Sequence, residues 1–140
     1  MDILRTFHLH MISDSTGETL ITIAKAVRVQ YAQVRAIEHL HALVRSRREL
    51  ERAVRDVESA PGIVLYTLFN RDLAEELERA CKRLNVPCVP ALKPILQVFE
   101  SYLGTPVNHL VEVNFENFPE LVDALGGVTY SGGCVVSRIN

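Results

Sequence analysis

Apolar and polar positions alternate along the N-terminal part of the chain with the periods of strands and helices in turn. Residues 6–12 form an apolar run with interleaved histidines, which predicts a β-strand. The run stops at a cluster of Ser, Asp, Thr and Gly residues, and a helical pattern follows it. The apolar face of that predicted helix consists of Leu20, Ile23 or Ala24, Val27 and Tyr31. Residues 34–40 then predict a second strand.

The same alternation continues to about residue 104. Ser46 and Glu49 have the spacing of a capping box, and Asn70 suits the start of the next helix. Between them, residues 63–69 are almost wholly apolar, which is typical of a strand that is covered on both faces. Residues 86–92 contain two prolines and predict a strand at a sheet edge. The last helix of this part begins near Pro94, with an apolar face of Ile95, Val98, Phe99 and Tyr102 or Leu103 expected to point inward.

The order of these elements predicts an α/β fold for residues 1–104. Alternating β-α units favour right-handed crossovers and a layered, mainly parallel sheet. Ligands of such sheets bind at the carboxyl ends of the strands. In residues 105–140 we expect a strand at 107–115, a short helix at 118–125 and a hairpin of 128–130 with 134–139. This β-α-hairpin addition would extend the same sheet, and the end of the chain directly after a strand indicates an excised piece.

Composition excludes several classes of partner. The formal net charge is −2, and the densest basic cluster, at 45–48, is followed at once by Glu49, so no nucleic-acid surface is predicted. No apolar run reaches the roughly 18–20 residues of a membrane span, and no signal peptide is recognisable. We therefore expect a cytoplasmic protein, with a homo-oligomer left open. The three cysteines, Cys81, Cys88 and Cys134, include no C-x-x-C pair, and Cys81 and Cys88 are predicted to be buried thiols.

The densest set of candidate functional groups is the segment 13–19, with the sequence SDSTGET. It lies between a strand and a helix, where unpaired N–H groups and the helix dipole favour an anion. The predicted phosphate-binding residues are Ser13, Ser15, Thr16, Gly17 and Thr19. Asp14 is the candidate catalytic residue, as a base, as a metal ligand beside the phosphate, or as a group that orients a hydroxyl. An ordinary helix cap explains one hydroxyl but not four, and the segment is neither a Walker A loop nor G-x-G-x-x-G.

Other polar side chains have simpler interpretations. Two histidine pairs, at 8 and 10 and at 39 and 41, each share a strand face, so neighbouring strands could bring four imidazoles together. No carboxylate or cysteine is spaced to complete a metal site, so we favour packed histidines at the sheet edge and predict no metal. A solvated face is favoured over phosphate contact for Arg45, Arg47 and Arg48. Tyr66 and Thr67 are expected in the core.

The stretch 8–20, HLHMISDSTGETL, resembles the N-terminal motif of the regulatory proteins of pyruvate, phosphate dikinase and phosphoenolpyruvate synthase. The likeness continues at 44–46, 62–68 and 86–89 and ends near residue 104. It implies a bifunctional enzyme that phosphorylates a threonine of the dikinase with ADP and removes that phosphate by phosphorolysis, yielding pyrophosphate. It also implies the dikinase or the synthase as partner, no tightly bound cofactor, and ADP, phosphate or pyrophosphate as ligands. The family's second domain carries a P-loop, G-x-S-R-x-x-K-T-P, which these 140 residues lack, so the chain alone is expected to be inactive.

Residues 107–115, 118, 121–128 and 133–140 resemble an internal piece of the LytR–CpsA–Psr family. That resemblance implies a membrane-anchored transferase of cell-wall glycopolymers, although its arginine-rich catalytic motif is missing and Arg138 is not predicted to be catalytic. Four hypotheses follow: a fragment of the regulatory kinase and pyrophosphorylase, a non-catalytic module that recognises a dikinase, a fragment of a wall-polymer transferase, and a chimera without function.

Overall fold

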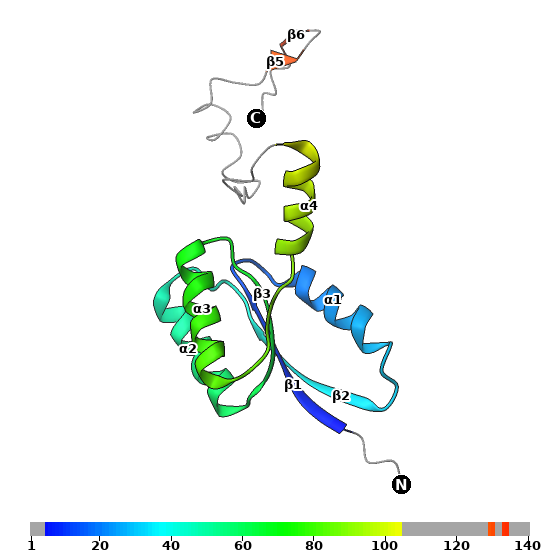
Figure 1. Cartoon of the computed structure of the whole chain (residues 1–140), viewed down its shortest axis with the longest axis vertical. Helices are drawn as coiled ribbons and strands as arrows, with labels where there is room; N and C mark the ends of the chain where they lie inside the picture. Colours follow the sequence, from blue (N-terminus) through cyan, green and yellow to red (C-terminus); the bar gives the residue numbers. More distant parts are fainter. Residues whose placement is uncertain (1–4, 105–128, 131–132, 135–140) are drawn as a thin grey trace, which may run out of the picture. The chain divides into compact units, whose positions relative to one another are not determined.

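The computed structural model describes residues 5–104 and two short strands at 129–130 and 133–134 (Figure 1). The chain divides into two compact units, Met1–Val107 and Asn108–Asn140, which are described separately. In the second unit, β5 (Thr129–Tyr130) pairs antiparallel with β6 (Gly133–Cys134), as the predicted hairpin requires. The strand predicted at 107–115 and the helix predicted at 118–125 lie outside the described residues.

The first unit is built on a four-stranded parallel sheet. Its strands are β1 (Arg5–Ser13), β2 (Val34–His41), β3 (Gly62–Thr67) and β4 (Cys88–Pro90), in the order β2-β1-β3-β4. This confirms the predicted α/β fold with alternating β-α units. The three-residue β4, which ends in a proline, lies at the sheet edge as its two prolines predicted.

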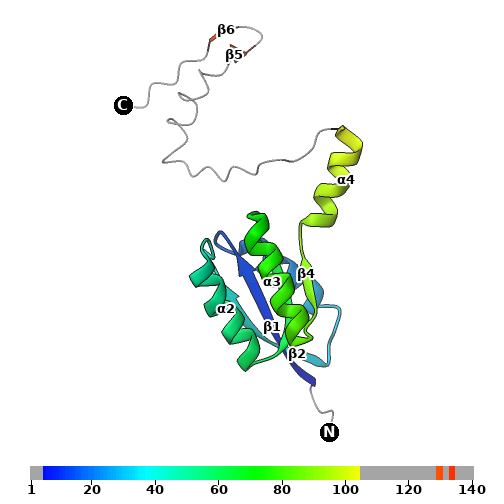
Figure 2. The ribbon, with the colours of Figure 1, turned by 60° about the vertical axis from the view of Figure 1, so that its left-hand side comes forward.

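Helices cover both faces of this sheet. The helix α1 (Glu18–Arg28) lies on one face, and α2 (Arg47–Ser59) and α3 (Arg71–Leu84) lie together on the other (Figures 1 and 2). Side chains of β1 alternate between the two layers, so that Leu9 and Met11 pack with α1 while Ile12 packs with α2 and α3. The larger core, between the sheet and α2/α3, contains Val44, Leu50, Ala53, Val57, Val64, Tyr66, Leu68, Leu73, Leu77 and Cys81.

Two predicted apolar faces are less buried than expected. Leu20 and Ala24 of α1 are buried, but Val27 is 51% exposed and Tyr31 lies beyond the end of the helix, because α1 ends at Arg28. The prediction that the apolar face of α4 (Lys93–Leu103) points inward is wrong: none of its residues is buried. Its period is helical as predicted, but no element of the described chain covers Ile95, Val98, Phe99, Tyr102 or Leu103. No helix among the described residues has the length and apolar character needed to cross a membrane.

The predicted capping box at the start of α2 is present. The Glu49 N–H donates to Ser46 Oγ at 3.3 Å, and the Ser46 N–H donates to Glu49 Oε2 at 2.9 Å. We expect Ser46→Ala to lower the free energy of unfolding by about 1 kcal/mol, because a helix N–H loses its acceptor. Urea denaturation followed by circular dichroism measures this. Ser59→Ala is the matched control, since Ser59 Oγ only donates to the Arg55 carbonyl at the far end of α2; equal effects of the two changes would contradict the capping argument.

Candidate functional site

The candidate site lies where the sheet changes its direction of winding. The chain leaves β1 toward α1 on one face, whereas it leaves the neighbouring strand β3 toward α3 on the opposite face. Loops at the carboxyl ends of two such strands diverge, and ligands of open α/β sheets usually bind there. The segment 13–19 follows β1 at this position.

Hydrogen bonds fix the β1 loop to the loop that follows β3. The Asp14 N–H donates to the Thr67 carbonyl at 3.3 Å, and the Phe69 N–H donates to Asp14 Oδ2 at 3.0 Å. The carboxylate of Asp14 is thus held by the backbone of the loop that follows β3. The predicted core residues Tyr66 and Thr67 are both buried, and Thr67 also donates through Oγ1 to Ser13 Oγ at 3.2 Å.

The loop that follows β2 holds the same segment from the other side. The N–H groups of Leu43 and Val44 donate to the carbonyls of Ser15 and Ser13, both at 2.9 Å. Arg45 Nε donates to the Asp14 carbonyl at 2.8 Å. The residue pattern did not predict that this loop is part of the site, and it favoured a solvated face for the arginines of the loop. That interpretation fits the exposed Arg47, which pairs with Glu76 at 3.0 Å, but it is incomplete for Arg45.

Ser13 is placed beneath the loop rather than in it. Its side chain is 1% exposed, and Oγ accepts hydrogen bonds from the Ser15 N–H at 3.0 Å and from Thr67 Oγ1. The hydroxyl predicted as a phosphate ligand therefore faces the protein interior in this structure, where it supports the turn. Ser15 is half-buried, and Thr16 and Thr19 are exposed.

The helix α1 begins without a side-chain cap. Gly17 is the N-cap residue, with a left-handed φ of +81°, and no side chain accepts a hydrogen bond from the first turn. A Cβ atom at Gly17 would lie 2.6 Å from Leu40 Cδ1, the end of a 44% exposed side chain that can shift, so the left-handed φ is the main reason for glycine here. The first intrahelical bond joins the Ile21 N–H to the Gly17 carbonyl at 3.0 Å. The N–H groups of residues 18–20 therefore have no acceptor within the helix, and the hydroxyls are not used as caps.

The two histidine pairs do meet, as the sequence indicated. His10 and His39 stack with ring centroids 4.4 Å apart, His8 Nδ1 lies 2.8 Å from His39 Nε2, and His10 Nδ1 lies 3.3 Å from His41 Nε2. His10 Nε2 donates to the Ala60 carbonyl at 2.7 Å, which fixes the neutral tautomer with its proton on Nε2. We call these four residues the histidine ladder. Within residues 5–104 the structure contains no group of three or more His, Cys, Asp and Glu side chains arranged to hold a metal ion.

Burial changes the protonation of two members of the ladder. It lowers the pKa of His10, and the neighbouring His39 and His8 act in the same direction against the Ala60 hydrogen bond. Burial and the proximity of His10 also lower the pKa of His41, against the attraction of Asp56. Asp56 Oδ2 lies 3.7 Å from His41 Nδ1 on the facing helix α2. Burial thus favours the neutral forms of His10 and His41, and His41 pairs in register with Ile12, next to the segment 13–19.

Comparison with known proteins gives one consistent family. A family model described as Kinase/pyrophosphorylase matches residues 9–123. A pyruvate, phosphate dikinase regulatory protein of Rhodopseudomonas palustris is 44% identical over 125 residues, which is 89% of this chain and 45% of that protein. Proteins of the same name from Bradyrhizobium diazoefficiens and Nitrobacter winogradskyi are 55% identical over 98 residues and 52% identical over 100 residues. These alignments cover 70% and 71% of this chain, and 35% and 36% of the two relatives.

The family match extends further along the chain than the sequence patterns predicted. The family match continues past residue 104, where the first resemblance was expected to end, and includes residues 105–123. The resemblance to LytR–CpsA–Psr proteins is not shown by the comparisons. The chain spans less than half the length of the curated relatives it matches.

Proposed function

This chain belongs to the kinase/pyrophosphorylase family, and we propose that it forms the phosphate-recognising first part of an enzyme that regulates pyruvate, phosphate dikinase or phosphoenolpyruvate synthase. The observation that supports the proposal most directly is the start of α1, where Gly17 replaces a side-chain cap and the N–H groups of residues 18–20 have no intrahelical acceptor. An anion that accepts from these groups would satisfy them and interact favourably with the helix dipole.

The proposed ligand set follows from which groups of the segment face solvent. Thr16 and Thr19 are exposed and can donate through their hydroxyls, whereas Gly17 is buried and shapes the turn through its left-handed φ. Ser15 lies at the margin, while Ser13 acts from beneath by holding the Ser15 N–H. Arg45 adds a positive charge next to the Asp14 carbonyl. We therefore assign phosphate contact to Ser15, Thr16 and Thr19, and support to Ser13 and Gly17.

Asp14 is proposed to act next to the bound phosphate. Its carboxylate is positioned by the Phe69 N–H at 3.0 Å, so it cannot swing freely toward solvent. In phosphorolysis, inorganic phosphate attacks the phosphorus of a phosphothreonine, the bond to the threonine oxygen breaks, and pyrophosphate leaves. A carboxylate held beside the attacking phosphate is placed to accept its proton, or to orient it.

We propose that the chain binds phosphate compounds but does not catalyse transfer alone. Transfer from ADP needs groups that hold the nucleotide phosphates, and neither a Walker A sequence nor G-x-S-R-x-x-K-T-P occurs in these 140 residues. The remaining length of the relatives, more than half of each protein, has no counterpart in this chain.

Calorimetric titration with inorganic phosphate, pyrophosphate and ADP tests the proposed site. We expect dissociation constants near the millimolar range, about −4 kcal/mol, because few groups contact each ligand. Thr16→Ala should weaken binding several-fold, by about 1 kcal/mol for the lost hydrogen bond. Gly17→Ala should weaken binding more than Thr16→Ala, since alanine is strained at this left-handed φ and its Cβ atom would displace the Leu40 side chain. Thr22→Ala is the matched control. Thr22 lies one turn further along α1 than Glu18, and its Oγ1 donates only to the Glu18 carbonyl.

Two results would count against the proposed site. Binding that is unchanged in Thr16→Ala and Gly17→Ala would place the anion elsewhere, and absence of binding at millimolar ligand would remove the anion site altogether. In the second case, capture of purified dikinase by the immobilised chain would favour the non-catalytic interaction module. If the chain neither binds phosphate compounds nor captures the dikinase, the family relationship remains but no function is supported for this part of the enzyme.

A further inference from the structure

The fold brings two cysteines from different elements to one face of the sheet. Cys88 of β4 pairs in register with Val64 of β3, and Val64 is fully buried in the core beneath α2 and α3. Paired residues of parallel strands share a face, so the Cys88 side chain points toward the same helices. Cys81 is 1% exposed in that core, on the buried side of α3.

A tight turn between α3 and β4 brings these cysteines together. Asn85 ends the helix with a left-handed φ of +55°, and its N–H donates to the Lys82 carbonyl at 3.2 Å. The Val86 N–H donates to the Cys81 carbonyl at 3.0 Å. This reversal directs β4 back along the last turns of α3, where Cys88 packs against the core cluster that contains Cys81.

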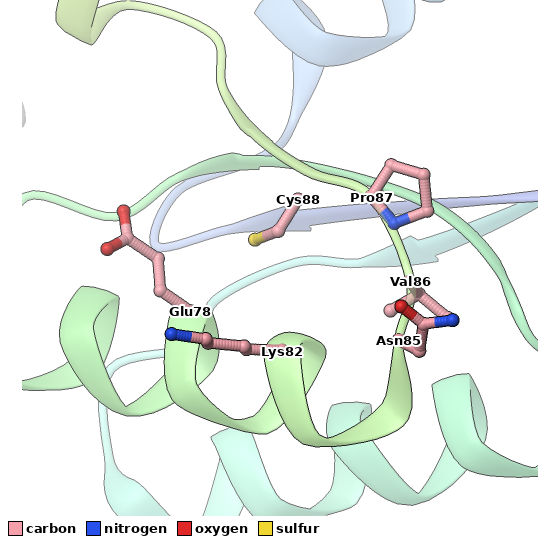
Figure 3. A pocket seen from close by; sticks show the side chains of 6 residues that line it. All are labelled: Glu78, Lys82, Asn85, Val86, Pro87 and Cys88. Carbon is pink, nitrogen blue, oxygen red and sulfur yellow. The ribbon is translucent and has the colours of Figure 1, made fainter.

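Only one of the two sulfurs is accessible from solvent. Cys88 lines a pocket of about 470 Å³ together with Glu78, Lys82, Asn85, Val86 and Pro87 (Figure 3). Figure 3 shows the Cys88 sulfur directed from β4 toward α3, on the side where Glu78 and Lys82 lie. Cys81 is not part of the pocket lining and lies behind Cys88 in the core.

We propose that Cys81 and Cys88 are a reversible modification site, in which Cys88 reacts with a low-molecular-weight disulfide from solution and Cys81 resolves the product to an internal disulfide. The two cysteines differ in access but lie in the same core, Cys81 within it and Cys88 packed against it, which is the arrangement that such a sequential reaction requires. This inference is independent of the proposed phosphate site and of the family's activity.

The reaction proceeds in two exchange steps. In the first, the Cys88 thiol loses its proton to solvent and its sulfur attacks a disulfide such as oxidised glutathione, so that a mixed disulfide forms and one glutathione thiolate leaves. In the second, the Cys81 thiol loses its proton and its sulfur attacks Cys88 Sγ, which displaces the second glutathione thiolate. Two protein thiols are oxidised by two electrons, and one glutathione disulfide is reduced to two thiols.

Local electrostatics set the expected rates of the two steps. In the reduced protein, the interaction with Cys88 lowers the pKa of the Cys81 thiol against the effect of burial. The same interaction, burial and the carboxylate of Glu78 raise the pKa of Cys88, which disfavours the thiolate that the first step needs. The first step is therefore expected to be the slower one and to accelerate as pH rises. Lys82 at the pocket rim offers a counter-charge to the carboxylates of glutathione.

The test uses the full chain with Cys134→Ser, so that only the two thiols of the pair remain. The protein is equilibrated in glutathione buffers of increasing oxidised fraction, alkylated after denaturation and digested with trypsin. Cleavage after Arg79, Lys82 and Arg83 separates the two cysteines. We expect a disulfide-linked peptide pair, 80–82 joined to the peptide that begins at residue 84, which disappears on treatment with dithiothreitol.

Single variants test the order of the steps. With Cys81→Ala, Cys88 should accumulate a glutathione adduct that cannot be resolved. With Cys88→Ser, both the adduct and the linked peptide should be lost, and Cys81 should react with alkylating agent only after denaturation. Circular dichroism establishes that each variant is folded. The proposal is overturned if the two-cysteine protein shows a stable adduct without the linked peptide, or if both thiols stay free in every buffer.

Discussion

Gly62→Ala should unfold most of the first unit, with a loss of more than about 4 kcal/mol in the free energy of unfolding. Gly62 begins β3 and pairs with His8 of the central strand β1. A Cβ atom at this position would overlap the His8 carbonyl oxygen and lie 2.6 Å from its carbonyl carbon. Because the obstacle is backbone, β3 would have to separate from β1. A domain of this size has only about 5–15 kcal/mol of stability in total.

Urea denaturation followed by far-ultraviolet circular dichroism measures this effect. Gly104→Ala is the matched control: Gly104 has a left-handed φ of +63°, but a methyl group at this residue would meet no other atom of the described chain within 4 Å. It should cost only about 1 kcal/mol, for the strained backbone alone. A Gly62→Ala protein whose denaturation midpoint equals that of the Gly104→Ala protein would show that the close approach of β1 and β3 is not required.

Acidification from pH 7 to 5 should destabilise the protein through the histidine ladder. The pKa values of His10 and His41 are lowered from 6.5 in the folded protein, so the unfolded chain binds protons first as the pH falls. Stability is therefore complete above about pH 7, begins to fall near 6.5, and continues to fall until the folded-state pKa values are reached. The slope can reach about 1 kcal/mol per pH unit for each histidine.

The hydrogen bonds of His10 explain why its ring resists a second proton. His10 already donates through Nε2 to Ala60, so its Nδ1 must accept from His41. A proton on Nδ1 would oppose that donor and place a charge 4.4 Å from the His39 ring. Of the charged groups on the facing helix α2, Asp56 attracts a proton on His41, but its side chain is 66% exposed and its effect is screened by water.

Denaturation curves at pH 8, 7, 6 and 5 in the parent and in His10→Gln/His41→Gln measure this contribution. The double variant should be less stable at pH 8, since glutamine fits the ladder poorly, but its stability should depend much less on pH between 7 and 5. Glu49→Gln is the control: the pKa of Glu49 is lowered from 4.5 by the hydrogen bonds of the capping box, so its contribution is lost only below that range. A parent protein equally stable at pH 7 and pH 5 would exclude the ladder as a proton-sensitive element.

Local sequence signals predicted most of the first unit. The apolar run at 63–69 indicated a strand covered on both faces, and β3 is buried between α1 and α2/α3 as expected. Ser46 with Glu49, and Asn70, marked the starts of α2 and α3 correctly. The periodicity of α4 was recognised, but a helical period does not tell whether another element covers the apolar face, and in α4 none of the described residues does.

The candidate site was only partly predictable, because it depends on contacts between distant segments. The segment 13–19 was recognisable from its composition, but nothing local indicated that Ser13 lies beneath the turn and bonds to Thr67, more than fifty residues further along the chain. Leu43 has a left-handed φ of +57°, and its N–H donates to the Ser15 carbonyl. Because this residue is not a glycine, the sequence did not indicate its backbone conformation. The residues at 44–46 were recognised from their family resemblance, from the charge of Arg45 and from Ser46 as a helix cap, but nothing local predicted the hydrogen bond from Arg45 to the Asp14 carbonyl.

The strand order has a consequence for synthesis on the ribosome. Although β1 is translated first, it lies between β2 and β3, so one of its edges finds no partner until residues 62–67 have left the exit tunnel. A nascent chain that stalls before that point displays an open apolar edge, which is a template for pairing with another copy. Premature termination between residues 41 and 62 should therefore produce aggregating peptides, whereas products that include β3 can close the sheet.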